Sequence, residues 1–255
     1  MEFIATPSSG APKETLLTQP FQKWTVLPHG KLVQIDENIL TVVGEIHMPL
    51  MDLPRRMTVV RLSDASLVIF SAIALDEDEM SALEAYGRPA YLIVPSDKHR
   101  LDAKTWKDRY PEIQVVAPEG AREKVNEVVS VDTVTPRFDD PNLKFVTVPG
   151  TRGREAALVV CAPNGTTLVL NDVVGNIRNA AGFGGWLLHL AGFAGKEAQI
   201  PAVVKMAVIE DKKALRTQLL QWAEINALVR VLVSHGSPIE ENSRQVLREL
   251  AGSLT

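Results

Sequence analysis

The chain of 255 residues is long enough for one large domain, or two small ones, with a substantial core. Hydrophobic residues make up 45% of it and charged residues 23%, which is ordinary for a soluble globular protein. Its net charge of -4 gives no electrostatic reason to expect nucleic acid or an acidic membrane as a partner. The single cysteine, Cys161, excludes an internal disulfide, so nothing in the composition indicates an oxidising compartment.

The first part of the chain, residues 1–20, is rich in Pro, Ser, Gly and Thr, which predicts a flexible arm. It lacks the basic region followed by an apolar region that marks a secretory signal. No apolar stretch of the sequence reaches the roughly 18 residues that are needed to span a bilayer. We therefore expect a single domain over residues 21–255, located in the cytoplasm and without a membrane partner.

The next part of the chain predicts strands first and helices later. Short β-branched or alternating runs, separated by turn residues, indicate strands between about Trp24 and Phe70, the last two forming a hairpin. Residues 76–86 begin with acidic side chains and are followed by Gly87, as expected for a short helix. The same criteria predict a strand over residues 89–94, a helix around 103–111, a strand over 113–118 and a helix over 120–129.

The second half of the chain repeats this scheme. Residues 143–149 and 155–172 predict strands, with Asn164 and Gly165 as a hairpin turn inside the second segment. Further along, apolar spacing predicts a helix over residues 211–225, a buried strand over 229–236 and a C-terminal helix over 241–252. Strands that come in runs, with helices late in each half, favour two sheets sandwiched between helices over an alternating βαβ fold.

An apolar, glycine-rich segment, residues 173–208, is predicted as a helical insertion between these elements. It contains Phe183, Trp186, Leu190 and Phe193, and its glycines interrupt any membrane-spanning run. Such a surface must be covered by the rest of the domain, by a second copy in a homo-oligomer, or by its own closure as a lid above a cleft. The glycines permit all three arrangements.

Polar side chains follow three of the predicted strands: Asp97 and His99 after the first, Asp172 after the second and His235 after the third. Strand ends are where open α/β architectures collect ligands and metals. Two imidazoles and two carboxylates are sufficient for one divalent ion of the zinc or iron type. The alternatives are that Asp172 caps a turn, that His235 is a satisfied core histidine, and that Asp97 and His99 are exposed.

The order of these motifs resembles the metallo-β-lactamase fold. A strand ending in a charged loop is followed by "VPG", then by "LVLND" and finally by "VLVSHG", and the match extends over nearly the whole chain from about Trp24. The resemblance implies a four-layered αβ/βα sandwich with a metal cleft at one edge of the two sheets. It is carried by the order of weak motifs rather than by any single one.

The sequence departs from the ligand signature of that superfamily, His-x-His-x-Asp-His. Laid on "PSDKHR", the signature places Pro95 and Asp97 at the first two histidines, His99 at the aspartate and Arg100 at the last histidine. The next expected histidine falls on Thr151, a poor ligand. A two-zinc hydrolase needs about five or six good ligands, which this sequence does not supply.

The resemblance keeps only Asp172 and His235 in place, so it implies at most one metal ion, zinc or iron. Our first hypothesis is a mononuclear metal-dependent hydrolase, in which Asp97 or His99 completes the ligand set or acts as general base. Arg100 beside such a site would repel the cation or bind an anionic substrate group. The second hypothesis is a metal-free module that binds a small molecule or another protein. The sequence does not name the substrate.

Overall fold

The computed structural model describes residues 19–48, 51–178, 185–186, 188–189, 192 and 194–254. The predicted arm of residues 1–20 lies outside these ranges except for its last two residues. Within the described ranges, no helix combines the length and the apolar character that a membrane span requires.

The first sheet is mixed. Its strand order follows the sequence: β1 (Val33–Asp36), β2 (Ile39–Met48), β3 (Met51–Arg61), β4 (Ser66–Phe70), β5 (Arg88–Ile93) and β6 (Gln114–Val116). The pairs from β1 to β4 are antiparallel, whereas β4, β5 and β6 run parallel. Parallel neighbours need crossover connections, and two helices supply them, α1 (Glu77–Tyr86) and α2 (Ala103–Arg109).

The second sheet has the order β10 (Leu228–Gly236), β9 (Gly165–Asn176), β8 (Ala156–Ala162) and β7 (Leu143–Thr147). The predicted turn at Asn164 and Gly165 joins β8 to β9 and is confirmed. The edge strand β10 is parallel to β9. The remaining helical elements are η1 (Glu119–Ala121), α3 (Arg122–Asn126), α5 (Ala202–Ala207), α6 (Lys212–Ala223) and α7 (Ser243–Gly252).

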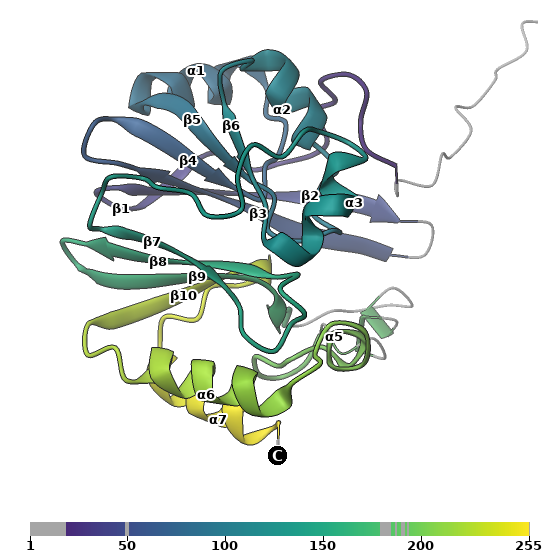
Figure 1. Cartoon of the computed structure of the whole chain (residues 1–255), viewed down its shortest axis with the longest axis vertical. Coiled ribbons are helices and arrows are strands. Elements are labelled where there is room, and N and C mark those ends of the chain that lie inside the picture. The colour runs from purple at the N-terminus through teal and green to yellow at the C-terminus, as the bar shows by residue number, and fades with distance from the viewer. Residues whose placement is uncertain are drawn as a thin grey trace, which may run out of the picture.

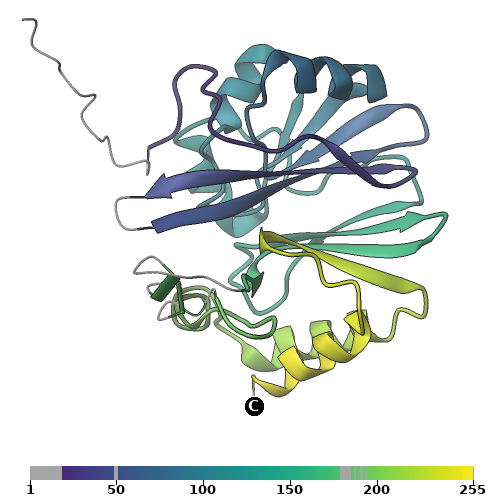
Figure 2. The ribbon, with the colours of Figure 1, turned by 180° about the vertical axis from the view of Figure 1, so that it is seen from behind.

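The two sheets pack face to face and are covered by helices on their outer sides (Figures 1 and 2). The alternation of side chains along β9 shows why: Leu168 and Leu170 belong to the core beneath α6 and α7, while Val169 belongs to the core between the sheets. A third core lies between the first sheet and α1, α2 and α3, with Trp106 fully buried in it. The predicted four-layered αβ/βα sandwich is confirmed.

The predicted insertion of residues 173–208 begins later than expected, because β9 continues to Asn176. Of its apolar residues, Phe183, Leu190 and Phe193 lie outside the described part of the chain. Leu188 is buried and forms a small cluster with Ile177 and Ala194, against which Leu53 of β3 packs. Part of this apolar segment is therefore covered by the domain itself.

The edge strand β10 is tied to the middle of the first sheet by Arg56 of β3. This guanidinium is buried, donates from Nη2 to the Gly236 carbonyl (2.9 Å) and from Nη1 to Thr41 Oγ1 (3.1 Å). Its neighbour Pro54 accepts a hydrogen bond from His235 Nδ1 (2.7 Å). Two adjoining contacts thus fix the end of β10 against β3.

Replacing Arg56 by Met should lower the free energy of unfolding by about 1–3 kcal/mol, since the buried Gly236 carbonyl then loses its donor. Chemical denaturation with a common m-value would measure the change. Arg61→Met on the same strand is the control, because Arg61 is exposed and its change should stay within about 0.5 kcal/mol. Equal effects of the two substitutions would contradict this role of Arg56.

Candidate metal centre

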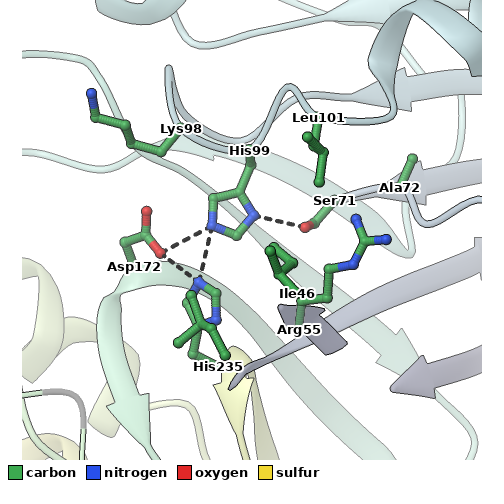
Figure 3. A pocket seen from close by; sticks show the side chains of 10 residues that line it. Ile46, Arg55, Ser71, Ala72, Lys98, His99, Leu101, Asp172 and His235 are labelled. Carbon is green, nitrogen blue, oxygen red and sulfur yellow. Dashed lines mark hydrogen bonds and ion pairs between the residues drawn. The ribbon is translucent and has the colours of Figure 1, made fainter. Parts of the chain in front are cut away.

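One cavity of about 200 Å³ opens where the two sheets meet at their edge. Its walls come from β2, β3, the segment after β4, the loop after β5, β9 and β10 (Figure 3). The lining residues are Ile46, Leu53, Arg55, Ser71, Ala72, Lys98, His99, Leu101, Asp172 and His235. Three of the four residues predicted from strand ends are therefore in one cavity.

His99, Asp172 and His235 converge on one point in this cavity. His99 Nε2 lies 3.0 Å from Asp172 Oδ1, His235 Nε2 lies 3.1 Å from the same oxygen, and the two Nε2 atoms are 3.2 Å apart. Asp172 and His235 thus lie within hydrogen-bonding distance of each other, with His99 in the same cavity. Within the described ranges these three side chains form the one group that offers metal-ligand atoms this close together.

His99 is positioned by the loop that follows β5. Its backbone N–H donates to the Ser96 carbonyl (3.3 Å), and its Nδ1 meets Ser71 Oγ at 2.8 Å. The loop ends at Asp102, a fully buried carboxylate that accepts from the Ala74 backbone (3.2 Å) and is paired with Arg55. This carboxylate holds the loop to the segment after β4.

Asp172 is delivered by a bulge in β9. Leu170 pairs with Val233 and Gly175 pairs with His235, so residues 171–174 stand opposite the single residue Ser234. Bulges of this kind re-aim side chains and occur often beside functional sites. Here the bulge turns the Asp172 carboxylate toward His99 and His235 (Figure 3).

Glu155 stabilises the bulge through hydrogen bonds to two of its residues. Its Oε2 accepts hydrogen bonds from Asn171 Nδ2 (3.0 Å) and from the backbone N–H of Asp172 (3.2 Å). Burial is the main cause that raises the pKa of Glu155 well above its ordinary value, and the negative charge of Asp172 is the second cause. Ionisation of Glu155 is therefore disfavoured beside the charged Asp172.

The tautomer of His235 follows from its contact with Pro54. A backbone carbonyl can only accept, so Nδ1 carries the proton and Nε2 faces Asp172 and His99. The Nδ1 of His99 is likewise occupied by Ser71 Oγ, which leaves its Nε2 directed at the same point. Metal-binding histidines commonly have their second nitrogen fixed in this way.

The spacing of the three inward atoms fits a tetrahedral metal site. Ligands about 2.0–2.1 Å from a zinc ion stand about 3.3 Å from one another, close to the separations of 3.0, 3.1 and 3.2 Å found here. Two imidazole nitrogens and a carboxylate oxygen suit zinc or iron. Without a cation or a proton at the centre, three acceptor atoms would face each other, so the arrangement calls for a positive charge.

The ionisation of the cluster is tightly coupled. Burial opposes a charge on Asp172, but the His99 and His235 imidazoles outweigh it and lower the pKa of this carboxyl below its ordinary value. Burial alone would lower the pKa of His235, but the hydrogen bond that its imidazolium donates to Asp172 outweighs burial and raises this pKa. A proton on His235 is thus the competitor that a metal has to displace.

The structure does not bring Asp97, predicted as a ligand or general base, into the cluster. Its carboxylate is paired with Arg154 and approached by Lys98 Nζ at 3.9 Å, so its charge is already compensated. Arg100 does not lie beside the cluster either: its guanidinium bonds the Lys124 carbonyl and pairs with Glu127 at 2.9 Å. Neither side chain is available to the centre of the cavity.

Sequence reasoning missed Ser71 and Glu155. Ser71 is the first polar residue after the fully buried strand β4, so the strand-end rule that selected His99 would have found it. Glu155 precedes a strand instead of ending one, and no pattern in the sequence marks it. Cys161 follows the apolar residues of β8 and is exposed.

Comparison with protein-family models finds no match. No curated protein matches the chain either. Solved structures do match: the metallo-β-lactamase FIM-1 from Pseudomonas aeruginosa, in its mono-zinc form, gives a TM-score of 0.60 at 11% identity, covering 89% of this chain and 96% of that one.

Two further metallo-β-lactamases are similar to the same extent. DIM-1, exposed to ceftazidime, gives a TM-score of 0.60 at 13% identity over 91% of this chain and 100% of its own. The metallo-β-lactamase from Erythrobacter litoralis, with β-mercaptoethanol in its active site, gives a TM-score of 0.59 at 12% identity, over 87% of this chain and 96% of its own. At such identities the likeness is carried by architecture rather than by sequence. The chain has the metallo-β-lactamase fold.

Proposed function

We propose that this protein is a mononuclear metal-dependent hydrolase of a small molecule, with His99, Asp172 and His235 as the metal ligands. The observation that carries the proposal is the convergence of two Nε2 atoms and one carboxylate oxygen, with Nδ1 of each imidazole occupied elsewhere. Three protein ligands leave a fourth tetrahedral position open, as in catalytic rather than structural zinc sites. The similarity to a mono-zinc form of FIM-1 supports a single ion.

A zinc or iron ion at this position would supply Lewis acidity toward a carbonyl or phosphoryl oxygen and would lower the pKa of water. The chain supplies the rest. Ile46, Leu53 and Leu101 give the cavity an apolar wall. Lys98, whose side chain is 75% exposed, stands at the mouth and presents a cation to an entering substrate.

The second candidate is a metal-free protein. It is favoured by the hydrogen bonds that the cluster makes on its own, because a proton on His235 satisfies Asp172 without an ion. Metal analysis of protein purified without a histidine tag separates the two. Less than about 0.1 ion per chain under metal-replete conditions would contradict the metal-dependent reading.

The wild-type protein should bind close to one equivalent of Zn²⁺ or Fe²⁺. Asp172→Asn removes a direct ligand charge, so it should weaken binding by more than the 10- to 100-fold loss that is typical of an outer-shell partner. Isothermal titration calorimetry would measure both. Asp78→Asn, an exposed carboxylate of α1, is the matched control and should bind like the wild type. Equal affinity of D172N and wild type would contradict the assigned ligand.

The affinity for the metal should fall as the pH is lowered. The raised pKa of His235 means that a proton occupies Nε2 below that value, and the metal must displace it. Affinity should therefore drop about tenfold per pH unit below the raised pKa and be insensitive to His235 above it. Competition with a chromophoric chelator across about pH 5 to 8, where histidine titrates, would test this. A flat profile over that window would contradict it.

Glu155 should set the position of Asp172 through its acceptor oxygen. Both donors bond to the same atom, Oε2, so Glu155→Gln keeps an acceptor for both and should bind metal nearly as the wild type does. Glu155→Met removes the acceptor at similar volume and should weaken binding by about 10- to 100-fold. Exchange of the Asp172 amide hydrogen, followed by NMR, reports the same contact without a metal. Equal affinity of the two variants would contradict the role of Glu155.

A further inference from the structure

Ser71 stands in the position of a nucleophile. Its Oγ lies 2.8 Å from His99 Nδ1, and on the opposite side of the ring His99 Nε2 lies 3.0 Å from Asp172 Oδ1 (Figure 3). A hydroxyl, an imidazole and a carboxylate are thus connected in series by two hydrogen bonds. This is the relationship that activates serine in acyl transfer, which is recognised by geometry and roles rather than by fold or order along the chain.

The backbone at Ser71 is strained. Its φ is 58°, in the left-handed region that residues other than glycine rarely adopt. Such conformations persist where the surroundings enforce them, often at active sites. Here the backbone N–H of Ser71 donates to the Ile93 carbonyl (3.1 Å), and the sharp turn at the end of β4 aims Oγ at His99. A strained turn directly after a strand also presents the serine of nucleophile elbows.

A donor for a developing oxyanion is close by. Ala72 follows Ser71 and lines the same cavity, and its backbone N–H has no hydrogen-bond partner within the described ranges. The N–H of the residue after the nucleophile is a recurring oxyanion-hole donor.

We propose that Ser71, His99 and Asp172 form a serine-hydrolase triad that operates when no metal occupies the cluster. In the acylation step Ser71 Oγ bonds to the ester carbonyl carbon while its proton passes to His99 Nδ1. The carbonyl oxygen accepts from Ala72 N–H, and Asp172 holds the imidazolium through Nε2–H. The bond to the leaving alcohol then breaks, and the alcohol oxygen takes the proton from His99 Nδ1.

Water completes the turnover. A water molecule gives one proton to His99 Nδ1 as its oxygen bonds to the acyl carbon. The bond between that carbon and Ser71 Oγ breaks, and Oγ regains the proton from His99. The products are a carboxylic acid and an alcohol, and no oxidant, reductant or cofactor enters the balance.

The cavity selects the class of ester. Its volume of about 200 Å³ lies below the roughly 300–1,000 Å³ of pockets that hold drug-sized ligands. The wall beside Ser71 and Ala72 is apolar, formed by Ile46, Leu53 and Leu101. The substrate class is therefore an ester of a short, apolar carboxylic acid.

The triad and the metal use the same atoms, His99 Nε2 and Asp172 Oδ1, so one excludes the other. With a metal bound, His99 Nδ1 has to carry its proton and donates to Ser71 Oγ, which leaves the hydroxyl without a base. The inference does not rest on the proposed metal-dependent function. Failure of the protein to bind metal leaves the triad intact.

The test uses full-length protein treated with a chelator and then incubated with p-nitrophenyl acetate. We expect release of p-nitrophenol with an acetyl group on Ser71, located by peptide mass spectrometry, which needs no variant. Ser71→Ala should abolish this adduct, and His99→Gln should slow its formation by about 10²- to 10⁴-fold, the usual contribution of a general base. Ser63→Ala, at an exposed turn bonded to Asp140, is the control and should react like the wild type.

Two results would overturn the inference. One is the absence of acetyl-Ser71 in metal-free wild-type protein whose fold is shown to be intact by circular dichroism. The other is an S71A variant that releases p-nitrophenol in a burst as large as that of the wild type. Saturation with Zn²⁺, in a protein shown by calorimetry to bind it, should suppress the adduct; unchanged labelling would contradict the shared use of His99.

Discussion

The contact between β3 and the end of β10 is the constraint on which the cavity depends. His99 lies in the loop that follows β5 of the first sheet, whereas Asp172 and His235 lie on β9 and β10 of the second. Within the described ranges no hydrogen-bonded ladder joins the two sheets. Pro54 and Arg56 bridge them by binding His235 and the adjoining Gly236. A buried guanidinium is an expensive way to hold two strands, since burial lowers the pKa of Arg56 by disfavouring its charge. The Gly236 carbonyl at the end of this edge strand can only accept a hydrogen bond, however, so a donor such as Arg56 is needed to bind it.

The second constraint is electrostatic. Asp172 is bonded by two imidazoles, and burial disfavours the ionisation of Glu155, which accepts from the Asp172 backbone N–H. The cluster is therefore arranged around the negative charge of Asp172. Two species can neutralise that charge, a proton on His235 or a metal ion at the centre. The first leaves His99 free to serve Ser71, and the second recruits it as a ligand. Under the two proposals, one set of side chains would serve two kinds of hydrolytic chemistry, and the occupant of the centre would decide between them.

The sandwich and most of the cluster could be predicted from the sequence because strand ends are visible in it. Buried runs that stop at His99, Asp172 and His235 bring those residues to one edge of the sheets. Asp97 also follows a buried strand, but its carboxylate pairs with Arg154 instead of joining the cluster. Arg154 lies 57 residues further along the chain, and no local sequence pattern connects the two residues. The tautomer of His235 and the bulge before Gly175 depend on contacts across the sheets, which neither spacing nor propensity records.

Leu53 belongs to two environments at once. It lines the cavity and also packs on the cluster of Ile177, Leu188 and Ala194. One wall of the cavity is therefore shared between the two-sheet sandwich and the cluster of Ile177, Leu188 and Ala194. A guest that displaces Leu53 would therefore also disturb the packing of Ile177, Leu188 and Ala194, so filling the cavity and holding this small cluster together draw on the same side chain.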